Sequence, residues 1–194
     1  MRIFVTVGNA LVPFDRLLQW TDLSLSDLSE SASWEGVCQH GPSRVRPARL
    51  AAKAHLTRFE FEHEMAAADV VVCHGGVGTL QEAMRQGHRP LVVARRAMFG
   101  EIVNDHQLEI ASALGETGRI ELIHDAEGLR AALFRYAHGE ARRGPAEELR
   151  PERLLPVAEA LSLGPFRPKP NPLGALLVRG FAALAPPLER LRVS

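Results

Sequence analysis

The chain has 194 residues, of which 46% are hydrophobic and 24% charged, an ordinary composition for a soluble globular protein. Its 23 Lys and Arg residues balance its 23 Asp and Glu residues, so net charge gives no reason to expect a nucleic-acid partner. The two cysteines, Cys38 and Cys73, have no metal-binding spacing and favour a reducing compartment over a disulfide framework. The sequence predicts neither a signal peptide nor a transmembrane helix.

The first third of the chain predicts two short strands and a helix. Residues 2–7 (RIFVTV) are β-branched and apolar, which predicts a buried strand that ends at Gly8 and Asn9. A helix is predicted for residues 13–20 (PFDRLLQW), where Pro13 suits the first turn. The Ser-rich segment that follows suits a poor helix or a loop, and residues 36–41 (GVCQHG) suit a second strand. The basic stretch 44–58 fits no element.

Strand and helix patterns then alternate as far as residue 162. The predicted strands are 69–74 (DVVVCH), 89–95 (RPLVVAR) and 119–124 (RIELIH). The predicted helices are 59–68, 78–87, 103–118, 125–139 with Asp125 as its cap, and 145–162 interrupted by prolines. This alternation predicts an α/β fold with a single doubly wound, mostly parallel sheet in a domain of residues 1–163.

Residues 164–194 differ from the predicted domain. Prolines predict an extended linker, and residues 175–191 suit an apolar, amphipathic helix that is too short to span a bilayer. Such a helix packs on its own domain, docks onto a partner or lies on a membrane surface.

Glycines separate the predicted strand 69–74 from the helix that follows. Gly75, Gly76 and Gly78 let a ligand approach the backbone, and the helix start offers free N–H groups to phosphate oxygens. Thr79 adds a hydroxyl donor. Gln81 stands where a dinucleotide fingerprint has its third glycine, and no Lys follows, so the segment is neither that fingerprint nor a P-loop. A tight turn that only packs strand against helix is the alternative.

Glu82 favours the nucleotide interpretation. It lies one helical turn beyond Thr79 and therefore on the same side of the helix as the loop. A carboxylate beside a phosphate site is unfavourable for phosphate, but it suits the ribose hydroxyls of a nucleotide. A solvated helix charge is the alternative.

A second polar cluster follows the strand 89–95. Asn104 or Asp105 can cap the next helix, whereas His106 and Gln107 suit recognition of sugar hydroxyls, because both side chains donate and accept. His106 is also a weak candidate for a general base, since no carboxylate is placed to orient it. Arg95 and Arg96 can pair with a uronate carboxylate or lie on the surface.

Four motifs, spread in order over residues 1–113, resemble the C-terminal, donor-binding half of glycosyltransferase family 28. They are IFVTVGNALVPFDRLL, VCQHGPSRVRP, HGGVGTLQEAMRQGHRPLVV and RRAMFGEIVNDHQLEIA. The last is similar to the bacterial subunit of a two-component exopolysaccharide glycosyltransferase. It also resembles the small catalytic subunit of the UDP-GlcNAc transferase that acts on dolichol-linked GlcNAc.

The resemblance implies half of a GT-B fold that binds a UDP-sugar and transfers the sugar with inversion. The implied donor-binding residues are Gly8, Asn9, His74, Gly75, Gly76, Gly78, Thr79, Glu82, His106 and Gln107. Asn9 stands where the family usually has Thr, which leaves its contact open. The cleft motifs contain no Asp-x-Asp, so no metal or other cofactor is expected.

The resemblance also implies a heteromer. A complete enzyme of this architecture has two such domains, so a separate membrane-associated subunit should bring the lipid-linked saccharide acceptor and the general base. The chain should then be cytoplasmic and peripheral at the inner face of the membrane through that partner. The alternatives are a nucleotide-binding regulatory or scaffolding module that transfers nothing, and a UDP-sugar epimerase or hydrolase. The transferred sugar, whether glucose, GlcNAc or glucuronic acid, is not determined.

Overall fold

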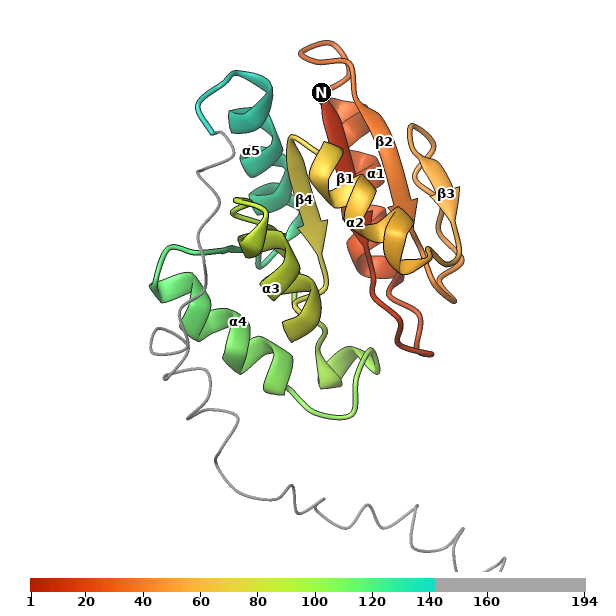
Figure 1. The fold of residues 1–194 in the computed structure, drawn as a ribbon, viewed down its shortest axis with the longest axis vertical. Helices are drawn as coiled ribbons and strands as arrows, with labels where there is room; N and C mark the ends of the chain where they lie inside the picture. Colours follow the sequence, from red (N-terminus) through yellow and green to blue (C-terminus); the bar gives the residue numbers. More distant parts are fainter. Residues whose placement is uncertain (142–194) are drawn as a thin grey trace, which may run out of the picture. The chain divides into compact units, whose positions relative to one another are not determined.

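The computed structural model describes residues 1–141, apart from the side chain of His106. These residues form a six-stranded parallel sheet in the order β3-β2-β1-β4-β5-β6. Figure 1 labels β3, β2, β1 and β4. The strands are β1 (Arg2–Thr6), β2 (Glu35–Gln39), β3 (Ala51–Lys53), β4 (Val70–Cys73), β5 (Leu91–Val92) and β6 (Glu121–Leu122). The predicted doubly wound α/β fold is confirmed. The predicted linker and C-terminal helix lie outside the described residues.

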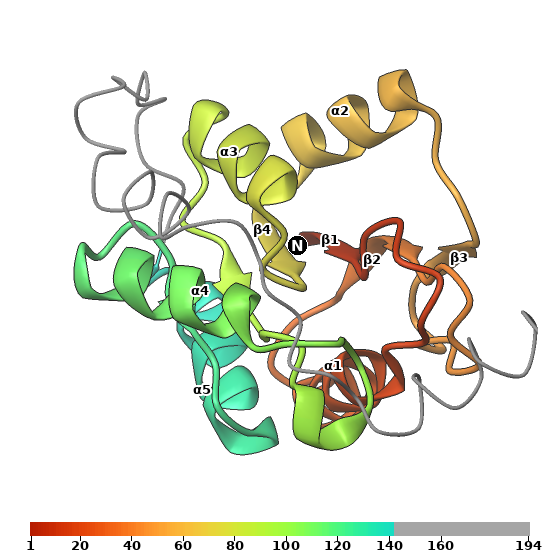
Figure 2. The same ribbon diagram turned by 90° about the horizontal axis from the view of Figure 1, so that it is seen from below.

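Helices cover both faces of the sheet. The α-helices are α1 (Asp15–Asp27), α2 (Arg58–Ala67), α3 (Val77–Arg85), α4 (His106–Glu116) and α5 (Ala126–Ala137), and a short 3₁₀ helix spans Ala97–Phe99. Helices α1 and α5 pack on one face and α2, α3 and α4 on the other (Figures 1 and 2). None of the helices within residues 1–141 is long and apolar enough to cross a membrane.

Strand β4 shows why the central strands are apolar at every position. Val70 and Val72 belong to the core beneath α1 and α5, whereas Val71 and Cys73 belong to the core beneath α3 and α4. All four side chains are buried, as expected for a parallel sheet that is covered on both sides. Burial also raises the pKa of the Cys73 thiol to about 12, so this cysteine is a core residue without nucleophilic character.

Two segments without a clear sequence pattern have defined structures. The first part of the Ser-rich stretch continues α1, where Thr21, Ser24 and Leu25 are buried. The hydroxyls of Thr21 and Ser24 donate to the carbonyls of Leu17 and Trp20, one turn earlier, and so have partners inside the helix. Strand β3, within the stretch that fitted no element, is an exposed edge strand. Its three residues have no apolar face, so hydrophobic alternation could not have identified it.

The sheet reverses its winding between β1 and β4. These strands are neighbours, but α1, which follows β1, and α3, which follows β4, cover opposite faces (Figure 2). The two connections therefore diverge at the carboxyl ends of the strands. Ligands of open α/β sheets bind at such switch points.

Candidate functional site

A cavity of about 410 Å³ lies at the carboxyl ends of β1 and β4. It is lined by Gly8, Asn9, Gln39, Leu56, Thr57, Arg58, Phe61, His74, Gly76, Val77, Gly78 and Thr79. Six of the predicted site residues therefore share one cavity, and they come from two loops that are more than 60 positions apart in the sequence.

The ring of His74 fills the space between two of the glycines. A Cβ atom on Gly8 would lie 2.4 Å from the His74 Cε1 atom, and a Cβ on Gly76 would lie 2.3 Å from its Nε2 atom. No side chain can be added at either position without moving the imidazole. Gly8 also has a φ of +74°, a conformation that residues with a side chain rarely adopt. Packing alone therefore explains these two glycines.

Gly75 and Gly78 give contrasting results. Gly75 has a φ of +85°, and a Cβ there would lie 3.2 Å from the Cγ1 atom of Val92, so it is also required by the local structure. A Cβ on Gly78 would meet no atom within 4 Å, although Gly78 lines the cavity. The fold does not need a glycine at this position. Its missing side chain instead keeps the first turn of α3 open to a ligand.

The first turn of α3 faces the cavity without a capping side chain. Gly76 is its N-cap residue and makes no side-chain capping hydrogen bond, and the first turn contains no acidic residue. The first intrahelical bond runs from Leu80 N–H to Gly76 C=O, 3.0 Å, so the preceding N–H groups need another acceptor. Because these groups carry the positive end of the helix dipole, the site favours an anion.

His74 is uncharged at neutral pH. Burial, together with the positive charge of Arg95, lowers the pKa of His74 to about 4, although the carbonyl of Thr6 opposes this shift. A neutral imidazole carries one N–H donor and one acceptor nitrogen. Its Nδ1 atom is buried without a hydrogen-bond partner among the described residues. His74 can therefore act as a neutral hydrogen-bonding group beside α3, and it is a poor base.

Gln39 is a cavity residue that sequence reasoning did not select. Thr6 Oγ1 donates to Gln39 Oε1 at 2.7 Å, and Gln39 Nε2 donates to Asn9 Oδ1 at 3.0 Å. This chain of bonds fixes the Asn9 side chain at the cavity edge and leaves its amide nitrogen to donate. Asn9 can therefore serve as a polar contact even though it departs from the family pattern. The signal for Gln39 was a polar residue at the end of a buried strand.

The outer wall of the cavity comes from the start of α2 and was also missed. Its residues are Leu56, Thr57, Arg58 and Phe61. Thr57 Oγ1 accepts from Glu60 N–H, and the Glu60 carboxylate accepts from Thr57 N–H, which forms a capping box. The T-x-x-E pattern at 57–60 was the available signal. The wall offers two apolar side chains and one guanidinium.

Glu82 lies beside this wall but does not line the cavity. Its carboxylate accepts from Arg85 Nε and Nη2, at 3.0 and 2.5 Å, and from the side chain of Gln86. The hydrogen bond from Arg85 is the main reason why its pKa is lowered, and the charge of Arg58 on the wall acts in the same direction. Glu82 is therefore an ionised, partnered carboxylate, and its predicted ribose contact stays a prediction.

The loop after β5 brings Gln107 next to the glycine turn. The carbonyl of Gln107 lies 3.9 Å from the position of a Cβ on Gly75, and its Oε1 atom is buried without a partner among the described residues. His106 begins α4, but its side chain lies outside the described atoms, so its predicted role stays a prediction. Asp105 occupies the N-cap position without capping the helix, because its Oδ1 accepts from Ala97 N–H, 2.8 Å away.

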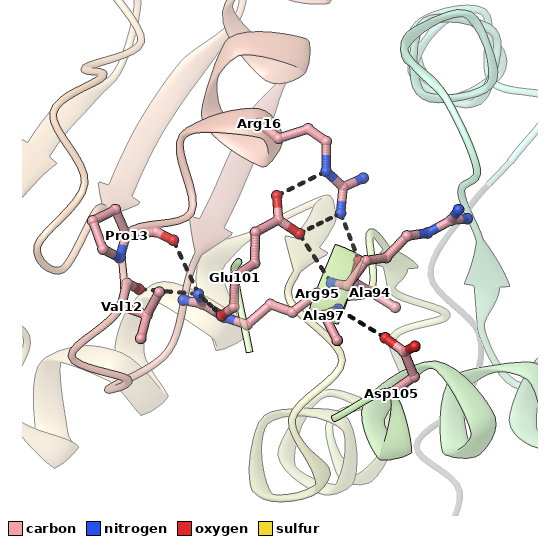
Figure 3. Close-up of polar contacts among 9 residues, drawn as sticks. Val12, Pro13, Arg16, Ala94, Arg95, Ala97, Glu101 and Asp105 are labelled. Atoms are coloured by element: carbon pink, nitrogen blue, oxygen red, sulfur yellow. Dashed lines mark hydrogen bonds and ion pairs between the residues drawn. The ribbon is translucent and has the colours of Figure 1, made fainter. Parts of the chain in front are cut away.

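Arg95 is buried, so the hypothesis that it pairs with a substrate carboxylate is wrong. Its Nη1 atom donates to the carbonyls of Val12, Pro13 and Glu101 at 3.0 to 3.2 Å (Figure 3). Its Nη2 atom donates to the carbonyl of Val7 at 3.0 Å. The Glu101 carboxylate is also engaged, because it accepts two bonds from Arg16 and one from Arg96 N–H. Both residues hold loops together.

Comparison with known proteins gives consistent results. Residues 2–147 match the family described as "Glycosyltransferase family 28 C-terminal domain". The chain is 29% identical over 155 residues to the UDP-N-acetylglucosamine transferase subunit ALG13 of Yarrowia lipolytica, covering 69% of this chain and 75% of that protein.

Two solved structures share the fold. A solution structure of ALG13 matches with a TM-score of 0.52 and 14% identity, over 80% of this chain and 94% of that one. The crystal structure of the glycosyltransferase of kitacinnamycin matches with a TM-score of 0.52 and 23% identity, over 83% of this chain. The chain spans only 37% of that glycosyltransferase.

Proposed function

We propose that this chain, which belongs to the family of glycosyltransferase family 28 C-terminal domains, is the donor-binding subunit of a glycosyltransferase that uses a UDP-sugar. One observation carries the proposal. Gly78 lines the cavity at the start of α3, and no packing contact requires a glycine there. An open helix N-terminus in a family of sugar transferases is best explained by a diphosphate.

Each part of the UDP-sugar is assigned to a part of the cavity, beginning with the diphosphate. The N–H groups of the first turn of α3 hold the phosphate oxygens, and the neutral His74 and the amide of Asn9 add further contacts. We place the uridine toward the wall formed by Leu56 and Phe61, and we assign the ribose hydroxyls to the Glu82 carboxylate. Gln107, and by the family resemblance His106, then face the sugar.

The reaction is a displacement with inversion at the anomeric carbon. An acceptor hydroxyl oxygen bonds to this carbon while the bond from the carbon to the phosphate oxygen breaks, and UDP leaves with the bonding electron pair. Negative charge grows on the diphosphate as this bond lengthens. N–H donors already aimed at that charge stabilise the transition state more than the ground state. Neither a metal nor another cofactor is required in this proposal.

The proton of the acceptor hydroxyl needs a base from elsewhere. The described lining of the cavity contains no carboxylate, and the pKa of His74, about 4, makes it a poor base. We therefore assign the base to a second, membrane-associated subunit that also brings a lipid-linked saccharide acceptor. Support comes from the ALG13 relative, which is described as a transferase subunit. With such a partner, we expect the chain to act at the cytoplasmic face of a membrane.

Calorimetric titration of the purified chain with UDP and with ADP tests the donor site. We expect the chain to bind UDP in preference to ADP. Glu82→Ala should weaken UDP binding by roughly tenfold, the loss of one or two hydrogen bonds to a carboxylate. Glu127→Ala is the matched control, because Glu127 forms the same fork with Arg130 on α5, away from the cavity. Equal affinity for UDP and ADP would contradict the assignment.

The missing base also leaves a second function open, a nucleotide-binding regulatory subunit. The two functions differ in their dependence on the cavity. If the chain is catalytic, transfer from a UDP-sugar by the complex with its membrane subunit falls when Gln107 or Gly78 is substituted. A complex whose transfer rate is unchanged by both substitutions would favour the regulatory function.

A further inference from the structure

Five exposed apolar side chains lie on two neighbouring loops that follow β1 and β5, and the first of these loops contributes Gly8 and Asn9 to the cavity. Leu11 and Val12 follow Gly8 and Asn9, and Met98, Phe99 and Val103 lie between β5 and α4. Leu11, Met98 and Val103 are 92%, 75% and 87% exposed. We call these five residues the apolar rim. Exposed apolar clusters of this kind mark sites of interaction on soluble proteins.

The apolar rim is held in place by buried charged groups. Arg95 donates from one nitrogen atom to carbonyls in both loops, those of Val12, Pro13 and Glu101. Arg16, at the start of α1, joins Glu101 at 2.8 Å (Figure 3). Its guanidinium also lies over the Phe99 ring, 5.1 Å from the ring centroid. A surface fixed before binding loses little conformational entropy when a partner docks.

The charge of the rim indicates the kind of partner. Residues 10–13 contain no ionisable side chain, and residues 96–103 contain only Arg96 and Glu101, the second of which is occupied by Arg16. A rim without a cluster of free cations is poorly suited to an anionic membrane, which attracts several Lys or Arg residues. It matches the centre of a protein interface, which is poor in charge.

We propose that the apolar rim is the docking surface for the separate polypeptide that binds the acceptor. This inference rests on the proposed function, which assigns the acceptor to a second polypeptide because the ALG13 relative is described as a transferase subunit. The acceptor must reach a sugar held in the cavity, so that polypeptide has to contact the cavity mouth. The rim is continuous with the cavity lining through Gly8 and Asn9 and offers the apolar area for this contact.

The test uses the triple variant Leu11→Asp, Met98→Asp, Val103→Asp of the full chain. These three side chains are the most exposed of the rim, so the variant should fold and bind UDP as the wild type does. The probe is the purified polypeptide whose co-expression gives transfer from a UDP-sugar. We expect the variant to bind it at least 100-fold more weakly and to lose transfer in parallel. Leu23→Asp is the control, because Leu23 is 60% exposed on α1 outside both loops.

The remaining outcomes separate this inference from the proposed function. Unchanged binding of the partner by a variant that binds UDP normally would overturn the docking surface alone. The docking surface and the proposed function would both be overturned if the wild type did not bind UDP. They would also be overturned if no co-expressed polypeptide gave transfer from a UDP-sugar. Wild-type flotation with vesicles containing phosphatidylglycerol, abolished in the variant, would identify a membrane surface instead. A wild-type dimer in sedimentation velocity that becomes a monomer in the variant would identify contact between copies of this chain.

Discussion

Gly78→Ala should move stability and ligand binding in opposite directions. The added Cβ meets no atom within 4 Å, so the folded chain accommodates it without strain. Gly78 lies in the first turn of α3. Replacing it with Ala reduces the conformational entropy of the unfolded chain, which stabilises the folded state. The expected gain in the free energy of unfolding is about 0.4–1 kcal/mol. For a chain of this size that corresponds to a rise in Tm of roughly 1–4 °C.

The same methyl group should weaken the binding of UDP. It occupies the space that lies open in front of the first turn of α3, where we place the diphosphate. Displacing a phosphate oxygen from one N–H donor costs about 1.5–3 kcal/mol for a hydrogen bond to a charged group. This is a loss of roughly 10- to 150-fold in affinity. Thermal unfolding gives the stability and calorimetric titration gives the affinity, on the same protein sample.

The control for this pair of measurements is Gly115→Ala. Gly115 lies within α4, outside the cavity, and its added Cβ would lie 3.7 Å from the nearest atom, the Cβ of Leu122. It should raise stability without changing UDP affinity. The reasoning is refuted if Gly78→Ala binds UDP as tightly as the wild type. A fall in its Tm would show that the fold does need this glycine, which would remove the observation on which the proposed function rests.

Three further predictions test the surroundings of the site. Arg95→Leu removes the donor to four loop carbonyls, and the free energy of unfolding measured in urea should fall by about 3 kcal/mol or more. The control variant Arg96→Leu should change this free energy by less than about 0.5 kcal/mol. Equal effects of the two substitutions would contradict the structural role of Arg95. The pKa of His74 is about 4 in the folded chain, against an ordinary value of 6.5. As pH falls, the unfolded chain therefore takes up this proton before the folded chain does. The free energy of unfolding should consequently decrease between pH 6.5 and pH 4, by up to roughly 3 kcal/mol. His74→Asn should remove that part of the pH dependence, and an identical pH profile of the variant would show that His74 is not the cause. Calorimetry in the presence of EDTA should give the same UDP affinity as without it. If EDTA abolished UDP binding and added Mg²⁺ restored it, the expectation of a metal-free donor site would be wrong.

Local patterns predicted the centre of the site. An apolar run, glycines and an amphipathic segment in succession specify β4, the turn and α3, because each depends on residues within one or two turns of one another. Gly87, with a φ of +81°, ends the helix where the sequence predicted. Alternation of strands and helices predicted a parallel sheet, and the shared edge of such a sheet brings Gly8 and Gly76 to one cavity.

Local patterns did not show which of these residues serve packing and which can contact a ligand. The glycine motif suited a tight turn and a phosphate site equally, and only the position of the His74 ring separates Gly8 and Gly76, which packing requires, from Gly78, which it does not. The wall at Leu56 and Phe61 escaped notice because its residues follow an exposed edge strand without an apolar pattern.

The sequence alone determined the glycine turn at the end of β4 and the order of the strands and helices other than β3, because these depend on short-range spacing. Its motifs indicated the family of the chain by resemblance. The tertiary structure decided which polar residues are free to meet a ligand. Arg95 looked available for a substrate, yet its partners are carbonyls 82 to 88 residues away in the sequence. Contacts at that separation exist only after β1 and β5 enter the same sheet, and the burial they impose turns a candidate binding residue into a support for the loops at the cavity mouth.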